Sequence, residues 1–371
     1  MRKVFRDFID AITIKTAIII LFILSLSLTV GAIGYGTYTS WSRSNEQVIT
    51  RLGDNLNRGI VQQVREYLHI PEHIIQLNLG LIENEGIDFE DSLIRNRFFL
   101  NTLDTQDDMI YSFSYGSREG EYYGARRNET GQVELMVNNR ETGGNSWYYD
   151  VGDNGSLGEF IQDFGAFDPR TRAWYETALR FEDFAYSPVY KHFVMNDLTI
   201  SAAAPVKRNS DEIDGVLGVH ILLSGLNGAL SEITESADSY AMIVERETGN
   251  VIANSLGQDN YILDAEGNFQ MIAISETDNR IANTTYEEYL AGNRSLIEGQ
   301  RGQEKLYSMA TDFTMPGVDW VVITAVPESL LGTTVDDALR ESLIIAFMGL
   351  LISILVFVVI IKKLLYPMEE T

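Results

Sequence analysis

The sequence predicts an α+β fold, with two small antiparallel-sheet units on a long N-terminal stalk helix, flanked by two transmembrane helices. Three observations lead to this prediction: two long uncharged apolar runs, a helical apolar repeat behind the first run, and strand-and-turn patterns between the runs. The 371 residues allow two or three domains, and an apolar content of 45% is sufficient for a packed core. Wholesale disorder is therefore excluded.

The composition excludes further classes of protein. The chain has no Cys, which excludes disulfide scaffolds, Cys-ligated zinc sites and thiol catalysis. It has 53 acidic and 28 basic residues, for a formal net charge of −25. Because a nucleic-acid backbone is bound by clustered Lys and Arg, we expect no nucleic-acid partner.

The two apolar runs without a charge lie at 16–35 and 343–361. As helices, each would be roughly 30 Å long, the thickness of the hydrocarbon core of a bilayer. A buried core helix is an alternative for either run, and a cleaved signal peptide is an alternative for the first. The apolar region of a signal peptide usually has only about 7–15 residues, so we expect two membrane spans.

Basic residues beside these runs predict how the chain is oriented in the membrane. They are Arg2, Lys3, Arg6, Lys15, Lys362 and Lys363. Basic residues flank spans on the cytoplasmic side, so we expect both termini in the cytoplasm and residues 38–340 outside it. Residues 36–342 contain 22 basic and 49 acidic residues, and 22 − 49 = −27. The acidity of the chain therefore belongs to its exterior part.

A stalk helix is predicted directly after the first span, over 38–80. Its apolar residues recur every four positions, as Val48, Leu52, Leu56, Ile60, Val64 and Leu68. We expect this helix to continue the membrane helix and Pro71 to kink or end it locally. The apolar row could mediate dimerisation or pack on the sheets.

Strands and turns follow the stalk. Strands are expected at 109–116, 121–127, 132–138, 186–190, 197–206 and 215–223, with helices at 170–180 and 224–235. Asp168 and Pro169 provide an N-cap and an N1 proline for the first of these helices. A second unit opens with a hairpin at 239–255 and closes with strands on either side of Pro316 and Gly317.

The order of several short segments carries a family resemblance: GEYYGARR, FDPRTRAWYETAL, SPVY, LTISAAAPV, GVLGVHILLSGL and PGVDWVVITAVPES. Together they resemble a double Cache domain, the extracytoplasmic ligand-sensing module of bacterial receptors, in which two PAS-like units stand on a stalk helix. The resemblance covers roughly residues 40–335. The final KKLLYPMEET is similar to the start of a HAMP linker, which normally leads to a kinase, cyclase or methyl-accepting module.

The resemblance implies a domain order and a location. The order is a cytoplasmic tail 1–15, a span 16–37, a stalk 38–80, a membrane-distal unit 81–235, a membrane-proximal unit 236–340, a span 341–362 and a HAMP-like start 363–371. The expected location is the bacterial inner membrane, and a homodimer through the stalk helices is expected.

A ligand site in the distal unit is also implied by the resemblance. In relatives that bind amino acids, the motif has six positions, and Arg172, Trp174, Tyr175 and Tyr190 match four of them. Phe167 replaces a Tyr, and His220 replaces an Asp. An Arg binds a carboxylate with two parallel hydrogen bonds, whereas His lacks the negative charge with which Asp pairs an ammonium group. We therefore expect a small ligand with a carboxylate that is not necessarily an α-amino acid.

Strand alternation supports the position of His220. In 215–223, Leu217, Val219, Ile221 and Leu223 form one apolar face, so His220 lies on the other face, with Gly218 leaving room beside it. A hydrogen-bonded structural histidine is the alternative reading.

Other residues of the motif region also have structural readings. Trp174 could be a core residue, Asp168 a helix cap and Arg170 a surface residue. Tyr122, Tyr123 and Arg126 are interpreted mainly as scaffold.

Metal and cofactor motifs are set aside. His69 and His73 have the i, i+4 spacing of metal ligands, but Pro71 lies between them and no third ligand is evident. Residues 150–159 resemble a calcium loop only superficially, because Gly152 replaces an oxygen ligand, and a polar turn is expected. No cofactor is expected. The prediction is a membrane-anchored sensor, and the alternatives are an exterior hydrolase or a structural ectodomain.

Overall fold

A computed structural model of the chain describes residues 14–84, 86–106, 108–207, 212–235, 239–263, 269–293, 296–331 and 335–365. By contacts these fall into two compact units. One unit holds the described residues up to Leu52 together with those from Glu328 onward, and the other is Gly53–Pro327. Each unit is described in turn below.

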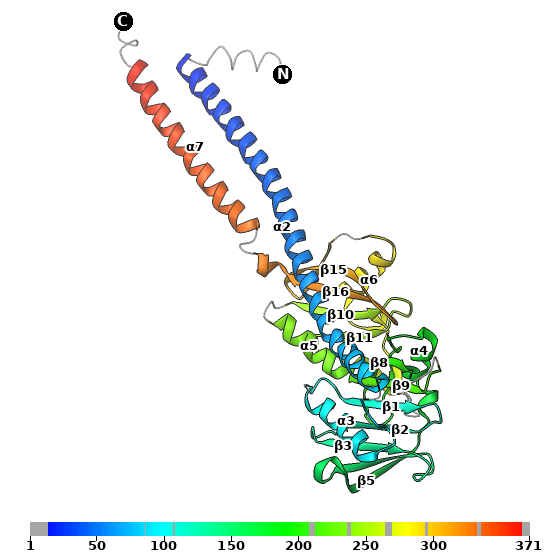
Figure 1. Cartoon of the computed structure of the whole chain (residues 1–371). Helices are drawn as coiled ribbons and strands as arrows, with labels where there is room; N and C mark the ends of the chain where they lie inside the picture. The colour runs from blue at the N-terminus through cyan, green and yellow to red at the C-terminus, as the bar shows by residue number, and fades with distance from the viewer. Residues whose placement is uncertain are drawn as a thin grey trace. The chain divides into compact units, whose positions relative to one another are not determined.

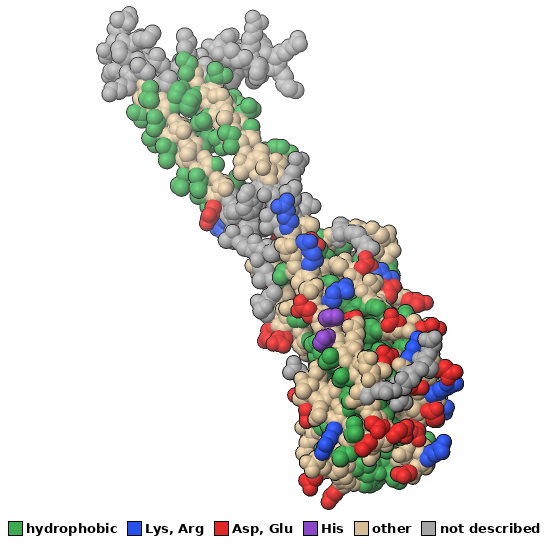
Figure 2. Space-filling model, in the orientation of Figure 1, with side chains coloured by type: hydrophobic (Ala, Val, Ile, Leu, Met, Phe, Trp, Pro, Cys, Tyr) green, Lys and Arg blue, Asp and Glu red, His purple; other side chains and the backbone are tan. Residues whose placement is uncertain are grey.

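The first unit consists of two apolar helices (Figure 1), the beginning of α2 (Ile14–Glu83) and α7 (Val335–Leu365). Candidate spans are Ile18–Ser40, with a mean hydropathy of 2.3, and Arg340–Ile360, with a mean hydropathy of 3.2. Figure 2 shows hydrophobic side chains over both helices. The rings of Phe22 and Phe357 stack with centroids 3.6 Å apart. Length and composition thus fit the two predicted spans.

Helix α2 does not end at Pro71, which lies inside the 70-residue helix. Pro71 has no N–H, so the carbonyl of Tyr67 loses its helical partner. Packing offsets this loss, because Leu68, Ile74 and Ile75 on either side of Pro71 are buried in the core. In addition, the Tyr186 hydroxyl donates a hydrogen bond to the Leu68 carbonyl.

The second unit contains two main antiparallel sheets. The first has nine strands in the order β5-β4-β3-β2-β1-β9-β8-β6, with β7 paired to β8. Its strands are β1 (Ser112–Ser117), β2 (Tyr122–Arg127), β3 (Val133–Asn138), β4 (Asn145–Val151), β5 (Leu157–Ala166), β6 (Ala185–Tyr186), β7 (Tyr190–Lys191), β8 (Leu198–Val206) and β9 (Gly215–Leu222). The helices of this part are α3 (Ser92–Asp104), α4 (Ala173–Phe181) and α5 (Leu223–Glu235), with 3₁₀ turns η1 (Asp153–Gly155) and η2 (Pro169–Thr171).

The second sheet has five strands in the order β11-β10-β16-β15-β14. These are β10 (Tyr240–Glu245), β11 (Val251–Asn254), β14 (Ile297–Arg301), β15 (Glu304–Met315) and β16 (Val318–Pro327), and helix α6 (Arg280–Leu290) packs on β14, β15 and β16. A small hairpin joins β12 (Tyr261–Leu263) to β13 (Phe269–Met271), and two 3₁₀ turns are η3 (Ile274–Glu276) and η4 (Glu328–Leu331). The predicted α+β class with antiparallel sheets is confirmed.

One face of the first sheet packs on helices. Leu217, Val219 and Ile221 share a core cluster with Ile60, Val64 and Leu68 of α2. The part of the apolar row from Ile60 to Leu68 therefore packs on the first sheet, which excludes it as a free dimer face. The side chains of Val48 and Leu52 lie outside the described residues. Figure 1 shows α3 beside β1, β2 and β3.

The opposite face of the first sheet is aromatic. It holds a second cluster in which Trp174 and Tyr175 of α4 pack with Tyr122, Tyr148 and Phe167. Trp174 covers the two glycine positions Gly116 and Gly218, where an added Cβ would lie 3.1 Å from its ring. The room that Gly218 leaves is therefore filled by Trp174 and His220.

Candidate ligand-binding site

A small cavity of about 30 Å³ lies on the aromatic face of the first sheet. The residues that line it are Tyr111, Ser112, Tyr122, Met136, Tyr148, Phe167, Arg172, Trp174, Tyr190, Lys191, His192, Phe193 and His220. Five of the six predicted ligand residues are among them. The structure therefore brings together side chains that are up to 53 positions apart in the sequence, from Phe167 to His220.

Tyr175 is the predicted residue that does not line the cavity. Its hydroxyl lies 3.4 Å from the Ser117 carbonyl oxygen, at the β1–β2 turn. Consecutive helix residues point about 100° apart, so when Trp174 faces the cavity Tyr175 is turned away from it. The ligand contact expected of Tyr175 is thus not supported by its position.

The backbone before α4 explains why Arg172 points inward and Arg170 does not. The Asp168 carboxylate accepts a hydrogen bond from the Arg170 backbone N–H at 3.0 Å, and Pro169 follows it in the first turn of η2. The Arg170 side chain folds back onto Asp168, with Nη2 2.8 Å from Oδ2, which lowers the pKa of the Asp168 carboxyl. The predicted cap is confirmed, although it caps η2, and α4 begins only at Ala173.

The Arg172 guanidinium lies beside two aromatic rings that also contact each other. Its central carbon lies 4.4 Å from the Phe167 ring centroid and 4.8 Å from that of Phe193. Its Nε is buried without a hydrogen-bond partner in the described part of the chain. Burial lowers the pKa of this guanidinium, but Arg stays charged in proteins. A buried donor without a partner costs about 1–3 kcal/mol, so this group is suited to bind an anion.

His220 is held by hydroxyl groups on both ring nitrogens. Its Nε2 lies 2.8 Å from Ser114 Oγ, and its Nδ1 lies 2.7 Å from Ser201 Oγ. The Tyr190 hydroxyl extends this network, at 2.7 Å from Ser201 Oγ. Burial lowers the pKa of His220 to about 3, so the ring is neutral at physiological pH. The structural reading of His220 fits these hydrogen bonds, and its position in the cavity lining leaves ligand contact as a prediction.

The Ser114–His220 pair has the spacing of a nucleophile and its base. However, Ser114 is fully buried, and a His with a pKa of about 3 is a weak base. The partner of Nδ1 is a serine hydroxyl and not a carboxylate, which would orient and stabilise an imidazolium. The geometry therefore favours binding over hydrolysis.

His192 is a cavity residue that the sequence did not indicate. Its Nδ1 accepts hydrogen bonds from the backbone N–H groups of Val194 at 3.1 Å and Met195 at 2.9 Å. Its ring meets Tyr111 edge to face at 4.6 Å, and burial is the main cause that lowers its pKa to about 3. The neutral ring must then carry its proton on Nε2. This residue lies in the loop after β7, where no strand or helix pattern could place it.

Tyr122 also lines the cavity, although it was interpreted as scaffold. It faces Gly116 across the β1–β2 ladder, on the same sheet face as His220. Tyr123 points to the other face, where the Arg95 guanidinium lies 3.7 Å from its ring centroid. Strand alternation could have separated these two tyrosines if His220 had been used as the reference.

Arg126 shares the cavity face but is already paired. Its Nε and Nη2 lie 2.9 Å and 2.7 Å from Glu134 Oε2, and both side chains are buried. Its Nη1 donates to the Tyr111 hydroxyl at 3.1 Å. The scaffold interpretation of Arg126 fits these contacts.

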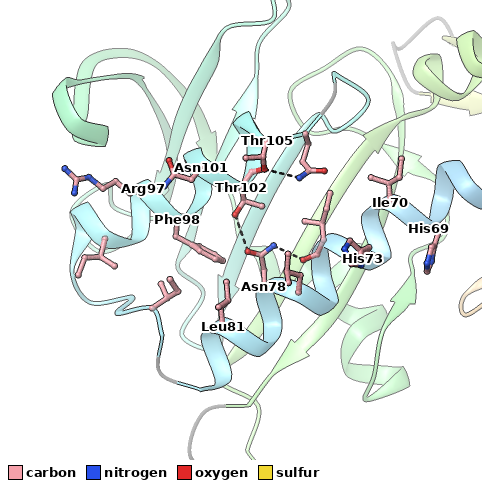
Figure 3. A pocket seen from close by; sticks show the side chains of 15 residues that line it. His69, Ile70, His73, Asn78, Leu81, Arg97, Phe98, Asn101, Thr102 and Thr105 are labelled. Carbon is pink, nitrogen blue, oxygen red and sulfur yellow. Dashed lines mark hydrogen bonds between the residues drawn. The ribbon is translucent and has the colours of Figure 1, made fainter.

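A larger open groove of about 760 Å³ lies between α2 and α3 (Figure 3). Its lining is mainly apolar, and Asn78 is held by Thr102 Oγ1 at 3.2 Å and the Ile74 carbonyl at 2.8 Å. The Arg97 guanidinium donates elsewhere, to the Asn154 carbonyl at 2.5 Å. Without converging charged groups, this groove is less suited to a small polar ligand than the cavity.

His69 and His73 lie at the groove on α2 (Figure 3). The His69 Nδ1 is 2.9 Å from Glu72 Oε2. Among the described residues, no group of three or more His, Cys, Asp or Glu side chains is arranged to hold a metal ion.

Comparisons with known proteins give the fold a context. Residues 134–228 match the family model of the methyl-accepting chemotaxis protein-like, first PDC sensor domain. The ligand-binding domain of the Campylobacter jejuni chemoreceptor Tlp3, solved with L-valine, is similar over 80% of this chain and 98% of that chain, at 14% identity and a TM-score of 0.50. The same domain with 4-methylisoleucine matches over 79% and 96%, at 12% identity and a TM-score of 0.50. A search of curated proteins finds no match.

These comparisons support the predicted double Cache sensor architecture. The matched family segment, 134–228, contains all the predicted ligand residues. At such low identities the likeness to solved structures shows the fold alone.

Proposed function

We propose that this chain is a membrane-anchored extracytoplasmic sensor that binds a small carboxylate-bearing metabolite in the cavity beside Arg172. The observation that carries the proposal is the guanidinium of Arg172, which lies against the rings of Phe167 and Phe193 with a buried Nε that has no described partner. The family match over 134–228 supports a sensing role. The Tlp3 structures contain L-valine and 4-methylisoleucine, which both carry a carboxylate.

Ligand binding in this cavity requires a conformational change. The enclosed space is about 30 Å³, enough for one or two water molecules, whereas ligand pockets usually measure about 300–1,000 Å³. A ligand that binds only the opened cavity shifts the population toward that state, to the extent of its differential affinity. The chain leads from β16 through η4 into α7, so we propose that α7 transmits the change.

The proposed location is the bacterial inner membrane, with both termini in the cytoplasm. The basic residues before the first span and after the second support this orientation. Reporter fusions to the two termini test it, because a cytoplasm-specific reporter is expected to be active at both ends. Activity of an export-dependent reporter at either terminus contradicts the orientation.

A homodimer along α2 is proposed through a different face from the Ile60–Leu68 row. Ile70, Leu77 and Leu81 are 38%, 61% and 47% exposed, and they border the groove between α2 and α3. They lie on one side of the helix, within about 40° of each other by helical geometry. Anchoring in one membrane keeps two copies parallel, so these faces can meet.

An exterior hydrolase is the alternative from another class. The low pKa of His220 and the burial of Ser114 weigh against it. Turnover of a substrate panel by the purified chain, abolished by Ser114→Ala, would replace the sensor proposal.

A thermal-shift screen of the full chain in detergent tests the proposed function. We expect at least one small carboxylate to raise the melting temperature, because a ligand that binds only the folded state stabilises it. Arg172→Ala should abolish the shift, and the matched control Arg170→Ala should retain it. A shift of equal size in Arg172→Ala contradicts the proposal.

A further inference from the structure

We infer that the cavity selects short 2-oxo and 2-hydroxy acids over α-amino acids, with Arg172 binding the carboxylate and His192 donating to the oxygen on C2. This inference rests on the proposed function and specifies the ligand class of the same cavity. Two features support it: the described lining of the cavity contains no carboxylate to pair with an ammonium group, and the ring of His192, which carries its proton on Nε2, is part of that lining.

No carboxylate is among the described residues that line the cavity. The Glu134 carboxylate on the same sheet face accepts two hydrogen bonds from Arg126 and one from Asn128 at 2.9 Å. The ring nitrogens of His220 already bond to Ser114 and Ser201. An ammonium group that leaves water without an anionic partner loses much of its solvation, and the charge of Arg172 adds repulsion. The cavity therefore disfavours the ammonium of an amino acid.

His192 provides a donor of fixed direction. The backbone N–H groups of Val194 and Met195 both donate to its Nδ1, so the proton must reside on Nε2. Nε2 has no hydrogen-bond partner in the described part of the chain, and the ring lines the cavity. Such a donor matches a keto or hydroxyl oxygen and repels no anion.

His192 and Arg172 both line the cavity. The Phe193 ring is 4.8 Å from the guanidinium carbon of Arg172, and Phe193 follows His192 directly in the chain. In a 2-oxo or 2-hydroxy acid, the carboxylate and the C2 oxygen are on adjacent carbons. One small molecule that enters the opened cavity can therefore engage both side chains.

Four three-carbon acids compare the effect of the C2 substituent on affinity. They are pyruvate, L-lactate, L-alanine and propionate. They share the carboxylate and differ only in a keto oxygen, a hydroxyl, an ammonium or hydrogens at C2. In calorimetric titrations of the full chain in nanodiscs, we expect pyruvate and L-lactate to bind at least about tenfold more tightly than L-alanine. Equal or tighter binding of L-alanine overturns the inference.

Two variants assign the roles. His192→Asn can keep an acceptor for the two backbone N–H groups while it removes the Nε2 donor, so the affinity for pyruvate should fall to that for propionate. His220→Asp supplies an anion, to which Ser114 and Ser201 can still donate, so L-alanine should bind more tightly than it binds the wild type. Unchanged pyruvate affinity in His192→Asn contradicts the role of His192. If either variant fails to fold, the wild-type order of the four acids decides alone.

The two proposals fail in different ways. If L-alanine is preferred and Arg172→Ala abolishes its binding, the sensor proposal stands and the ligand class is wrong. If none of the four acids binds, the ligand class is also wrong, and the broader carboxylate screen still decides the proposed function.

Discussion

Arg126 and Arg172 lie on the same sheet face but differ in their electrostatic surroundings. Arg126 is paired with the buried Glu134, whereas Arg172 lies against two rings and has a buried Nε without a partner in the described structure. Removing one partner of a buried ion pair typically costs about 3–5 kcal/mol, because the other charge stays buried alone. Removing an unpaired buried donor should cost far less.

We therefore expect Arg126→Met to lower the melting temperature of the ligand-free chain strongly and Arg172→Met to change it little. Thermal unfolding of both variants beside the wild type measures the difference. A larger loss in Arg172→Met would mean that this guanidinium is a structural group, and the case for an anion site would weaken.

The two buried histidines predict a loss of stability in acid. The pKa of His192 and that of His220 are both lowered to about 3 in the folded chain, from 6.5. Below about pH 6.5 the unfolded state binds protons that the folded state does not, so stability falls as the pH falls toward 3. Each histidine contributes at most about 1.4 kcal/mol per pH unit in this window.

Melting temperatures between pH 4 and 8 test this dependence, and His220→Asn should have a shallower slope than the wild type. An equal slope in the variant would show that other groups dominate the acid response.

At the residue scale, the sequence placed five of six predicted ligand residues at the cavity. These residues were implied by the family resemblance, and alternation in β9 supported the position of His220. His192 was missed because its position depends on backbone hydrogen bonds within an irregular loop. Tyr175 does not line the cavity, because the direction of a residue on a short helix depends on how that helix docks.

Strand β7 and the loop after it contact the small β12–β13 hairpin. Lys191 Nζ lies 4.6 Å from the Phe269 ring centroid, and the Tyr261 hydroxyl donates to the Asn196 carbonyl at 2.9 Å. His192 and Phe193 of the same loop line the cavity. A ligand that moves this loop would therefore change its contacts with β12 and β13.

Tyr261→Phe removes one exposed hydrogen bond, which contributes about 0.5–1.5 kcal/mol. We therefore expect the ligand affinity to stay within about threefold of the wild type. The ligand-induced change in hydrogen exchange of the β12–β13 hairpin should differ from that of the wild type. Hydrogen exchange of residues 261–263 with and without ligand measures this. Identical ligand-induced protection in wild type and Tyr261→Phe would show that the Tyr261–Asn196 hydrogen bond does not couple the cavity to the hairpin.

The exposed side of α2 predicts where two chains meet. Because the chain has no Cys, a single introduced Cys reports one position. Leu77→Cys should form a disulfide-linked dimer in membranes under mild oxidation, whereas Gln76→Cys, about 100° around the helix, should do so much less. Equal cross-linking at both positions would contradict a defined dimer face.

At the element scale, hairpins with clear turns were predicted well, as in β1–β2 and β10–β11. Helix α3 was missed because Arg95 and Asn96 are buried in it, which obscures its amphipathic pattern. Strand β5 is mostly half-buried or exposed and lacks regular alternation. Pro71 misled the stalk prediction because tertiary packing on both sides of it outweighs one lost hydrogen bond.

For the whole molecule, the net charge of the chain does not predict the charge of its ligand. Residues 36–342 carry −27, and acidic side chains are spread over the visible face of the sheet unit (Figure 2). Inside, the described lining of the cavity contains Arg172 and Lys191 and no carboxylate. Net charge thus bears on solubility. The charge of the ligand depends on the few side chains that line the cavity.

The most direct test of the central claim is a calorimetric titration of the purified full chain with the small carboxylate that raises its melting temperature most. We predict saturation at about one ligand per chain, no chemical change of the ligand, loss of binding in Arg172→Ala and retention of binding in Arg170→Ala. Undiminished binding in Arg172→Ala, or conversion of the ligand to a product, would contradict a carboxylate sensor built around Arg172.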